Sequence, residues 1–341
     1  MQNKKKYIYG FLYITAGFMF FCLLLAISFF IDSIPFGGRD CIWELSKNKI
    51  LVYEMKKNYE SKDDNFLKDF KTNSSGFRDY EFGQEKDENI KKILVFGDSI
   101  AVGTDSIIYS NDLFSKQLEN IIEQDKSLKY RYDVYNMGVD GYNTVQEAEN
   151  LNLHVNEYKP DIVVVTYCLN DVDDCSRGIY YQILATSQFG PVGHYLLKSK
   201  IYNAFCQVLF DTMNLHEKIK IGKKCDKYWG FEESGMNIPE KGFRMFDFLQ
   251  KKYNFKLYVF IVPFLVDYNN YEYEKQHESV QSVLNKYNIK GFDMIKCFSD
   301  ISKDGSFFDS GLKDKMHPNE FGHRLMAEFI YKKLKTENAL N

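Results

Sequence analysis

Three side chains of this sequence have the types and the spacing needed to cleave an ester: Ser99, Asp314 and His317. A serine hydroxyl attacks an ester when an imidazole takes its proton and a carboxylate orients that imidazole. Asp314 and His317 lie three residues apart in "DKMHPN", so one tight turn can place the carboxylate against one ring nitrogen and leave the other for Ser99. Each also has a structural alternative, because "GDS" is common turn chemistry and Asp314 could cap a helix beside a surface His317.

The oxyanion that forms in such a reaction needs hydrogen-bond donors, and Gly138 and Asn170 can supply them. Gly138 in "NMGVDGYNT" has no side chain to keep a substrate oxygen from its N–H, and Asn170 in "YCLND" carries a neutral amide. The N–H of Ser99 is a third donor. Loss of one such donor typically costs about 10²–10³ in rate. Each residue alone is also typical of a turn, but together they predict an acyl-transfer site.

The elements predicted around these residues would bring them together. Hydrophobic periodicity predicts strands at 93–96, 132–135, 161–167, 256–262 and 292–295, and helices at 113–122, 144–158, 243–252, 274–287 and 318–334. Such alternation predicts a parallel sheet with helices on both faces. Ser99, Gly138 and Asn170 each follow a strand, and ligands of such sheets bind beyond the carboxyl ends of the strands. Pro318 is suited to the first position of the last helix.

A long uncharged segment near the N-terminus predicts a membrane anchor. Lys4, Lys5 and Lys6 precede residues 7–31, which carry no charge, and about 20 apolar residues are enough to cross a bilayer. An apolar surface on every side disfavours a buried core helix, and the length of the segment disfavours a cleaved signal peptide. By the positive-inside rule the lysines place the N-terminus in the cytoplasm and the rest of the chain, after about residue 32, outside the membrane.

The remaining chain divides into a lead-in and a large domain with an insertion. Residues 32–90 read as polar and irregular and contain "TNSSGFRD" at Thr72–Asp79. Residues 91–336 are the predicted α/β domain, interrupted at about 176–242 by a segment with scattered glycine, proline and aromatic residues. The aromatic side chains of this insertion could stack on sugars or pack the insertion onto the domain: Tyr180, Tyr181, Tyr195, Tyr202 and Trp229.

Composition argues against some classes of function. The net charge of −3 over 341 residues disfavours bulk attraction to nucleic acid. One of the seven cysteines, Cys22, lies in the predicted anchor, and the other six permit up to three disulfides or ordinary free thiols. The sequence contains no Cys-x-x-Cys pair and no Cys/His cluster, so we expect no metal and no organic cofactor.

The chain resembles the SGNH (GDSL-type) hydrolase superfamily, which takes its name from four residues. In order along this chain, they match Ser99, Gly138, Asn170 and His317. "VFGDSIAVG", "NMGVDGYNT", "YCLND" and "DKMHPN" are similar to its four sequence blocks. "NSSGFRD" is similar to a lead-in of some membrane-anchored bacterial members. The resemblance extends from Lys91 to about Leu334 and implies a flavodoxin-like three-layer α/β/α sandwich.

The resemblance also implies roles for individual residues. Ser99 would be the nucleophile, His317 the base and Asp314 its orienting acid. The oxyanion hole would consist of the Ser99 N–H, Gly138 and Asn170. Cys168 stands where the third block usually has glycine, and its side chain could narrow the pocket or tilt the loop that bears Asn170. We expect Asp171 to fix that loop by accepting backbone N–H groups, and Asp98 to stabilise the turn at Ser99.

These features predict a membrane-anchored serine esterase of the SGNH type, with its catalytic domain outside the cytoplasm. The expected substrate is an acyl ester on cell-envelope carbohydrate or lipid. One alternative is an O-acyltransferase that uses the same residues to pass the acyl group to an envelope polysaccharide. Another is a catalytically silent envelope-binding protein on the same fold, in which Ser99→Ala would leave the phenotype unchanged.

Overall fold

The computed structural model describes residues 15, 17, 19, 41–61, 69–83, 89–104, 107, 109–172, 179–180, 183, 220–230, 236–266, 268–299 and 316–341. The chain divides into two compact units, residues 1–41 with 181–216 and residues 42–180 with 217–341. The elements named below all belong to the second unit. The predicted anchor at 7–31 lies outside the described residues, apart from three positions. Of the helices that the structure describes, none is both long enough and apolar enough to cross a membrane.

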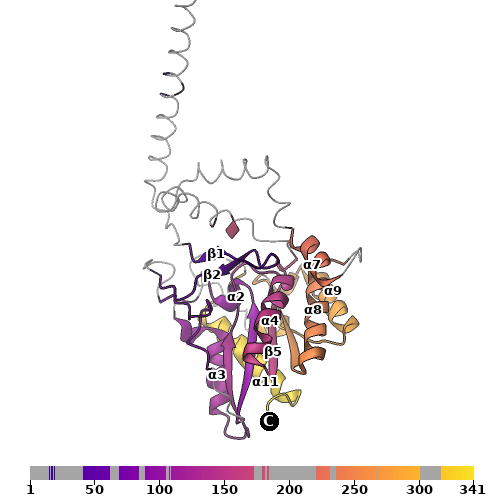
Figure 1. The fold of residues 1–341 in the computed structure, drawn as a ribbon. Coiled ribbons are helices and arrows are strands. Elements are labelled where there is room, and N and C mark those ends of the chain that lie inside the picture. The colour runs from indigo at the N-terminus through magenta and orange to yellow at the C-terminus, as the bar shows by residue number, and fades with distance from the viewer. Residues whose placement is uncertain are drawn as a thin grey trace, which may run out of the picture. The chain divides into compact units, whose positions relative to one another are not determined.

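A five-stranded parallel sheet forms the centre of the second unit (Figure 1). Its strands are β3 (Ile90–Gly97), β4 (Arg131–Asn136), β5 (Ile162–Cys168), β6 (Lys256–Val262) and β7 (Lys290–Asp293). They lie in the order β4-β3-β5-β6-β7. This is the flavodoxin-like order, in which the chain starts inside the sheet and reverses direction after the second strand. The predicted flavodoxin-like fold is confirmed, and the reversal point lies between β3 and β5.

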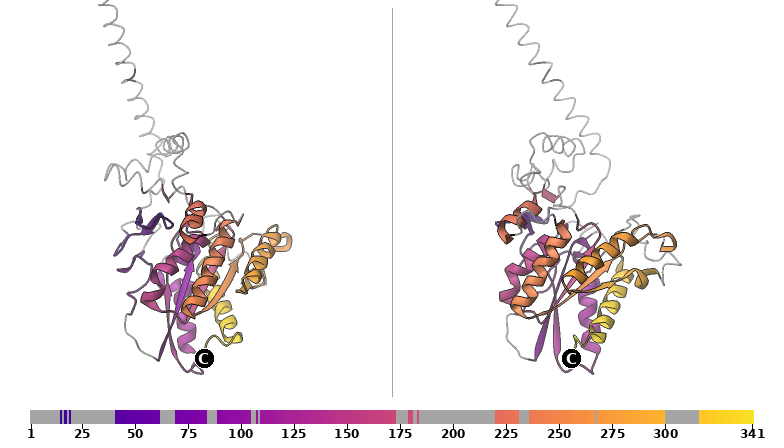
Figure 2. Two further views of the ribbon diagram at one scale, coloured as in Figure 1. Left: turned by 45° about the vertical axis from the view of Figure 1, so that its right-hand side comes forward. Right: turned by 90° about the vertical axis from the view of Figure 1, so that its right-hand side faces the viewer.

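Helices cover both faces of this sheet, as Figure 2 shows. On one face α3 (Phe114–Gln124) packs against α11 (Glu320–Thr336). On the other face α4 (Thr144–Tyr158) packs against α8 (Ile238–Tyr253). The remaining helices are short or peripheral: α2 (Ser99–Val102), α7 (Ile221–Trp229), α9 (Glu274–Lys286), α10 (Ile295–Ser299) and 3₁₀ turns at Ser110–Asp112 and Tyr268–Asn270.

Strand side chains alternate between the two helix layers. In β3, Ile93 and Val95 join the core that α3 and α11 complete. The ring of Phe96 instead packs against Phe246 of α8, with ring centroids 6.3 Å apart. In β5, Tyr167 packs against α8 in the same way. Because both faces of a covered parallel sheet are buried, its strands read as continuous apolar runs, which is why the sequence predicts them.

The ends of two helices show how local side-chain bonds set the boundaries. Helix α4 has the predicted bounds, because Asn143 and Gln146 form a capping box in which each side chain accepts the other's backbone N–H. The last helix begins at Glu320 and not at Pro318 as predicted. Asn319 caps it instead, by accepting the N–H of Gly322 at 3.0 Å.

The lead-in contains more regular structure than the sequence predicts. β1 (Trp43–Leu45) and β2 (Tyr53–Met55) form a two-stranded antiparallel sheet. The hydroxyl of Tyr142 donates to the carbonyl of Tyr53 at 2.6 Å, and the Tyr53 hydroxyl donates to the carbonyl of Asp140 at 3.2 Å. These bonds join the lead-in to the loop before α4.

The segment predicted as an insertion, residues 176–242, lies mostly outside the described residues. Its described part includes α7 and the first turn of α8, both of which pack on α4 within the second unit. The cysteines that the structure describes carry no disulfide: Cys41, Cys168, Cys225 and Cys297.

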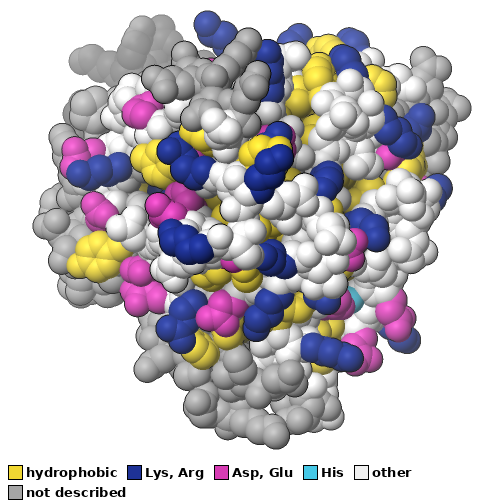
Figure 3. Space-filling model, turned by 90° about the horizontal axis from the view of Figure 1, so that it is seen from below, with side chains coloured by type: hydrophobic (Ala, Val, Ile, Leu, Met, Phe, Trp, Pro, Cys, Tyr) yellow, Lys and Arg dark blue, Asp and Glu magenta, His cyan; other side chains and the backbone are white. Residues whose placement is uncertain are grey.

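On the face drawn in Figure 3, basic and acidic side chains are interspersed. This mixture fits the small net charge of the chain. The described residues on this face therefore offer no single-sign field of the kind that attracts a polyanion.

Candidate active site

Ser99 is the first residue of α2 and follows the inner strand β3 after a tight turn. A Cβ at Gly97 would lie 2.3 Å from Thr166 Oγ1 of the neighbouring strand, so only glycine fits before the turn. The Asp98 side chain then caps α2 by accepting the N–H of Ile100 at 3.0 Å. Ser99 is 7% exposed, so its hydroxyl is held within a packed surface.

His317 meets Ser99 from a position 218 residues further along the chain. Its Nε2 lies 2.8 Å from Ser99 Oγ, which is hydrogen-bond distance. His317 lies two residues before Asn319, the N-cap of α11, close to a backbone that this cap fixes. In this geometry a neutral imidazole can take the proton of the hydroxyl. Asp314, the predicted orienting acid, lies outside the described residues.

Asn170 lies beside the same turn, at the end of β5. Its amide donates to Asp98 Oδ2 at 3.1 Å, and its second N–H has no partner among the described residues. Asp98 is fully buried, and it is bonded both to the helix that carries Ser99 and to the predicted oxyanion donor. Burial raises the pKa of Asp98, although these two hydrogen bonds and the nearby His317 oppose the shift.

Gly138 follows β4 and lies directly against α2. A Cβ at this position would lie 2.6 Å from the Cβ of Ala101, so glycine is required for the two segments to approach. The N–H of Gly138 donates to Asn136 Oδ1 at 3.1 Å. This N–H could reach a substrate oxyanion only by sharing or leaving that bond, a constraint absent from the sequence-based prediction.

The unusual residue of the third block, Cys168, is buried in the core. Its side chain is 1% exposed and belongs to the hydrophobic cluster on the α3 and α11 face of the sheet. Its N–H donates to Asp171 Oδ2 at 2.9 Å, as predicted for a carboxyl group that fixes this loop. The structure thus accommodates the cysteine inside the core and not in the pocket.

A buried arginine, Arg78, holds the far end of the helix that begins with Ser99. Its guanidinium donates to two carbonyl oxygens at the end of α2, those of Val102 and Gly103 at 2.9 and 3.1 Å, and to that of Ile107 beyond the helix at 3.0 Å. Arg78 is 1% exposed. Burial lowers the pKa of Arg78 to about 10, so it stays charged at neutral pH. A charged fork of donors is well suited to satisfy several carbonyls at once.

The next residue, Asp79, is connected through Asn136 both to α2 and to the Gly138 loop. Asp79 Oδ2 accepts the N–H of Asn136 at 2.7 Å, and Oδ1 lies 2.9 Å from Lys116 Nζ. The Asn136 amide donates to the carbonyl of Ala101 at 2.8 Å, while its oxygen accepts the N–H of Gly138. One carboxylate therefore fixes Asn136, and Asn136 fixes α2 relative to Gly138.

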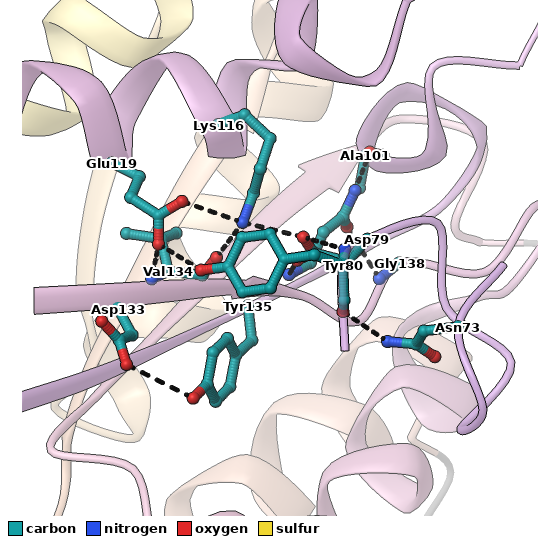
Figure 4. Close-up of polar contacts among 11 residues, drawn as sticks. Asn73, Asp79, Tyr80, Ala101, Lys116, Glu119, Asp133, Val134, Tyr135 and Gly138 are labelled. Carbon is teal, nitrogen blue, oxygen red and sulfur yellow. Dashed lines mark hydrogen bonds and ion pairs between the residues drawn. The ribbon is translucent and has the colours of Figure 1, made fainter. Parts of the chain in front are cut away.

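Figure 4 shows Lys116 of α3 between the carboxylates of Asp79 and Glu119. Its ammonium nitrogen lies 4.0 Å from the centre of the Tyr80 ring. Burial raises the pKa of Asp79 to about 6, and the charge of Lys116 opposes a larger shift. Asp79 is therefore ionised at neutral pH and loses its charge below about pH 6.

The sequence predicts no role for Arg78 and Asp79, although "TNSSGFRD" at Thr72–Asp79 is a recognisable segment of the lead-in. The side chain of Asn73 accepts two backbone N–H groups of this segment, each at 3.0 Å, and Gly76 has φ +91°. A tight turn of this kind directs the next residues inward. The sequence feature that could have indicated these two residues is the Asn-x-x-Gly turn at Asn73–Gly76, which is followed by two side chains of opposite charge.

The second histidine of the last segment, His323, is fully buried. Its Nδ1 accepts the N–H of Phe114, the first residue of α3, at 3.0 Å. Burial lowers the pKa of His323 to about 3, so the ring is neutral and can act as an acceptor. His323 therefore joins α11 to α3 and is separate from the pair formed by Ser99 and His317.

A family model described as GDSL-like lipase/acylhydrolase matches residues 93–330. The chain belongs to this family. As a member of the GDSL-like family it is a hydrolase that acts on ester bonds. The matched range includes Ser99, Gly138, Asn170 and His317, but it begins after Arg78.

No curated protein matches the chain. Similar solved structures include TesA (12% identity, 72% of this chain and 99% of that chain, TM-score 0.43) and the lipase/acylhydrolase from Enterococcus faecalis (18%, 72% and 96%, 0.43). Another is Axe2, an acetylxylan esterase from Geobacillus stearothermophilus (15%, 72% and 94%, 0.41). At these identities and TM-scores, assignment to the GDSL-like family depends on the family match alone.

Proposed function

We propose that this chain is a membrane-anchored serine esterase that forms an acyl-enzyme on Ser99. The observation that carries the proposal is the 2.8 Å between Ser99 Oγ and His317 Nε2, at the carboxyl ends of the strands, in a chain of an ester-hydrolase family. Open α/β sheets bind their ligands at this edge, next to the point where strand order reverses.

The reaction has two balanced halves. Ser99 Oγ attacks the carbonyl carbon of the ester while His317 Nε2 takes the hydroxyl proton. The tetrahedral intermediate then loses the alcohol, which leaves with the proton from His317, and the acyl group remains on Ser99. A water molecule attacks the acyl-enzyme by the same route, its proton passes through His317 to Ser99, and the carboxylic acid departs. In this proposal Asp314 orients the imidazole.

Donors near Ser99 would stabilise the oxyanion of each intermediate. The Ser99 N–H lies at the first residue of α2, and the second N–H of the Asn170 amide has no partner among the described residues. Asp98 holds the Asn170 amide in place before substrate arrives, so little reorganisation is needed during the reaction. The Gly138 N–H is the third proposed donor and must be released from, or shared with, Asn136.

The proposed location is the outer side of the cell membrane, with the N-terminus in the cytoplasm. Support comes from the three lysines before the uncharged segment 7–31. An enzyme tethered there would meet acyl esters on envelope carbohydrate or lipid. Protease treatment of intact cells tests this location, because residues after about 32 should be digested while the lysine-bearing end is protected.

The test of the mechanism is labelling of the full chain with a fluorophosphonate, followed by mass spectrometry. We expect an adduct on Ser99, because only an activated hydroxyl reacts with this reagent. His317→Ala should abolish the adduct, and Asp314→Asn should slow its formation by about 10²–10⁴. Ser106→Ala, a change at another serine of the same segment, is the matched control and should leave the rate unchanged.

Absence of an adduct, under conditions in which a reference esterase reacts fully, would overturn the proposed mechanism. An adduct on Ser99 that persists in His317→Ala would exclude His317 as the base. Product analysis with and without an added sugar acceptor then distinguishes hydrolysis from transfer of the acyl group.

A further inference from the structure

A groove outside the candidate active site lies between the loop that joins β1 to β2 and the helices α4, α7 and α8, which Figure 1 shows side by side. Its volume is about 740 Å³, which is typical of sites that bind small ligands. Aromatic rings and basic side chains line it: Tyr228, Trp229, Phe248, Lys47, Lys49 and Arg244. None of the lining residues belongs to the candidate active site.

A buried carboxylate, Glu149 of α4, organises the floor of this groove. It is 6% exposed and accepts the side-chain amide of Asn48 at 2.8 Å and the indole N–H of Trp229 at 3.0 Å. The oxygen of the Asn48 side chain accepts the N–H of Ile50 at 2.8 Å, which fixes the loop. Trp229 and Asn48 are thus oriented before any ligand arrives, and such preorganisation reduces the cost of binding.

The rings in the groove offer apolar surface beside these polar groups. Phe248 packs at 90° to Trp229, with ring centroids 5.8 Å apart. Tyr228 and Phe248 are each 51% exposed. A sugar fits this combination, because its C–H groups pack on an aromatic face while its hydroxyls bond to nearby polar side chains. A lipid surface would need neither a concave shape nor a buried, hydrogen-bonded carboxylate.

Charge around the groove favours an acidic ligand. Lys47, Lys49 and Arg244 are all exposed. The ammonium groups of the two lysines have no partner among the described residues. Glu149, the one carboxylate among the described lining residues, is already engaged by N–H donors. The two lysines therefore add uncompensated positive charge to the described lining of the groove, in a chain whose net charge is −3.

We propose that this groove binds an acidic oligosaccharide, whose sugar rings stack on Trp229 and Tyr228 and whose carboxylate or phosphate groups pair with Lys47 and Lys49. The groove would retain a charged polysaccharide on the protein. Binding needs no turnover, so the proposal stands or falls independently of the chemistry at Ser99.

Tryptophan fluorescence offers a direct test, because the chain has two tryptophans and the other, Trp43, is 4% exposed. The full chain with Ser99→Ala and Trp43→Phe leaves Trp229 as the single reporter. We expect oligogalacturonate, an acidic probe, to change this fluorescence in a saturable way and to bind at least about tenfold more tightly than neutral xylo-oligosaccharide. Lys47→Gln with Lys49→Gln should remove most of that preference and most of its salt dependence.

Two tyrosines of nearly equal exposure provide a matched pair of variants. Tyr228→Ala should weaken binding of the acidic probe by about tenfold, whereas Tyr109→Ala, at 50% exposed but outside the groove, should leave it unchanged. No saturable response, equal affinity for both probes, or indifference to Tyr228 and the lysines would overturn the proposal. Tighter binding of single-stranded DNA or of anionic lipid vesicles than of the acidic sugar would overturn the choice of ligand.

Discussion

Buried carboxyl groups lie in two places among the elements that carry the candidate active site. In the part of the chain that the structure describes, only one of these places, at Asp79, contains a cation. Asp79 has no exposed side-chain surface, pairs with Lys116 and accepts the N–H of Asn136. Glu147 and Asp171 are each 1% exposed. Among the described residues, neither oxygen of Glu147 has a hydrogen-bond partner, nor does Oδ1 of Asp171.

The two places show alternative ways to bury an acid. A carboxylate away from water is costly unless a cation or several donors compensate it, and otherwise it takes a proton. Burial raises the pKa of Glu147 and of Asp171 well above the usual range, and the nearby charge of Asp98 raises both further. The pKa of Asp79, at about 6, leaves it charged at neutral pH. The same functional group is thus compensated by a cation at Asp79, whereas at Glu147 and Asp171 burial acts against the charged form.

The largest effect should follow from Lys116→Met, which removes the cation from Asp79. We expect the free energy of unfolding, measured with urea, to fall by about 3–5 kcal/mol, because one member of a buried pair is left alone. Lys126→Met, at an exposed lysine, should change it by less than about 0.5 kcal/mol. Adding Asp79→Asn to Lys116→Met should recover part of the loss. A fall below about 1 kcal/mol would show that Asp79 does not depend on this cation.

Arg78→Met should have the next largest effect on the free energy of unfolding. It removes a buried cation whose hydrogen-bond partners are neutral backbone carbonyls. We expect a loss of about 2–4 kcal/mol, because the carbonyls at the end of α2 lose their donors. If those bonds hold Ser99 in place, the rate of fluorophosphonate labelling should also fall, by about 10² in the folded protein. Arg78→Lys keeps the positive charge but not the planar set of N–H donors. Its stability and its labelling rate should therefore lie between those of the parent chain and those of Arg78→Met. Full labelling rate in folded Arg78→Met would limit Arg78 to stability.

Glu147→Gln should have the smallest effect, with a sign that depends on pH. Because the folded-state pKa of Glu147 lies above its unfolded value, the native state binds more protons, and this group costs stability increasingly as pH rises above about 4.5. The variant lacks that cost. Its stability relative to the parent chain should therefore increase between pH 5 and pH 9, from within about 1 kcal/mol at the acid end.

The matched control for this measurement is Glu123→Gln, at an exposed glutamate of α3. It should shift stability equally at every pH in that range. A flat difference for Glu147→Gln as well would show that Glu147 is charged in the folded protein, like Asp79.

The juxtaposed pair, Ser99 and His317, could be predicted from the sequence because its signal is local. Ser99 follows an apolar strand and His317 precedes a capped helix, so each places a side chain able to do acyl-transfer chemistry at an element boundary. Helix α8 was predicted to start at 243 but starts at Ile238, where Asn237 caps it and accepts the N–H of Glu240 at 2.9 Å. That signal was also local, but it lay inside a segment assigned to an insertion.

The groups that hold the pair in place could not be predicted in this way. Arg78 is bound to backbone carbonyls, which every residue has, so nothing in the sequence marks its partners. The strands β1 and β2 have three residues each and pair with each other. Such short strands show no hydrophobic periodicity from which they could be predicted. Both cases depend on tertiary contacts between segments that are separate in the chain.

The position of Arg78 and Asp79 has a practical consequence for anyone who shortens this protein. A fragment cut at the start of the family match, Ile93, would contain Ser99 and His317 and would look complete by similarity. It would lack the Arg78 guanidinium, which holds the end of the helix that begins with Ser99, and the counter-ion of Lys116. A truncation intended for expression should therefore begin upstream of β1, at or before residue 42, since the physical boundary of this enzyme precedes the boundary shared with its relatives.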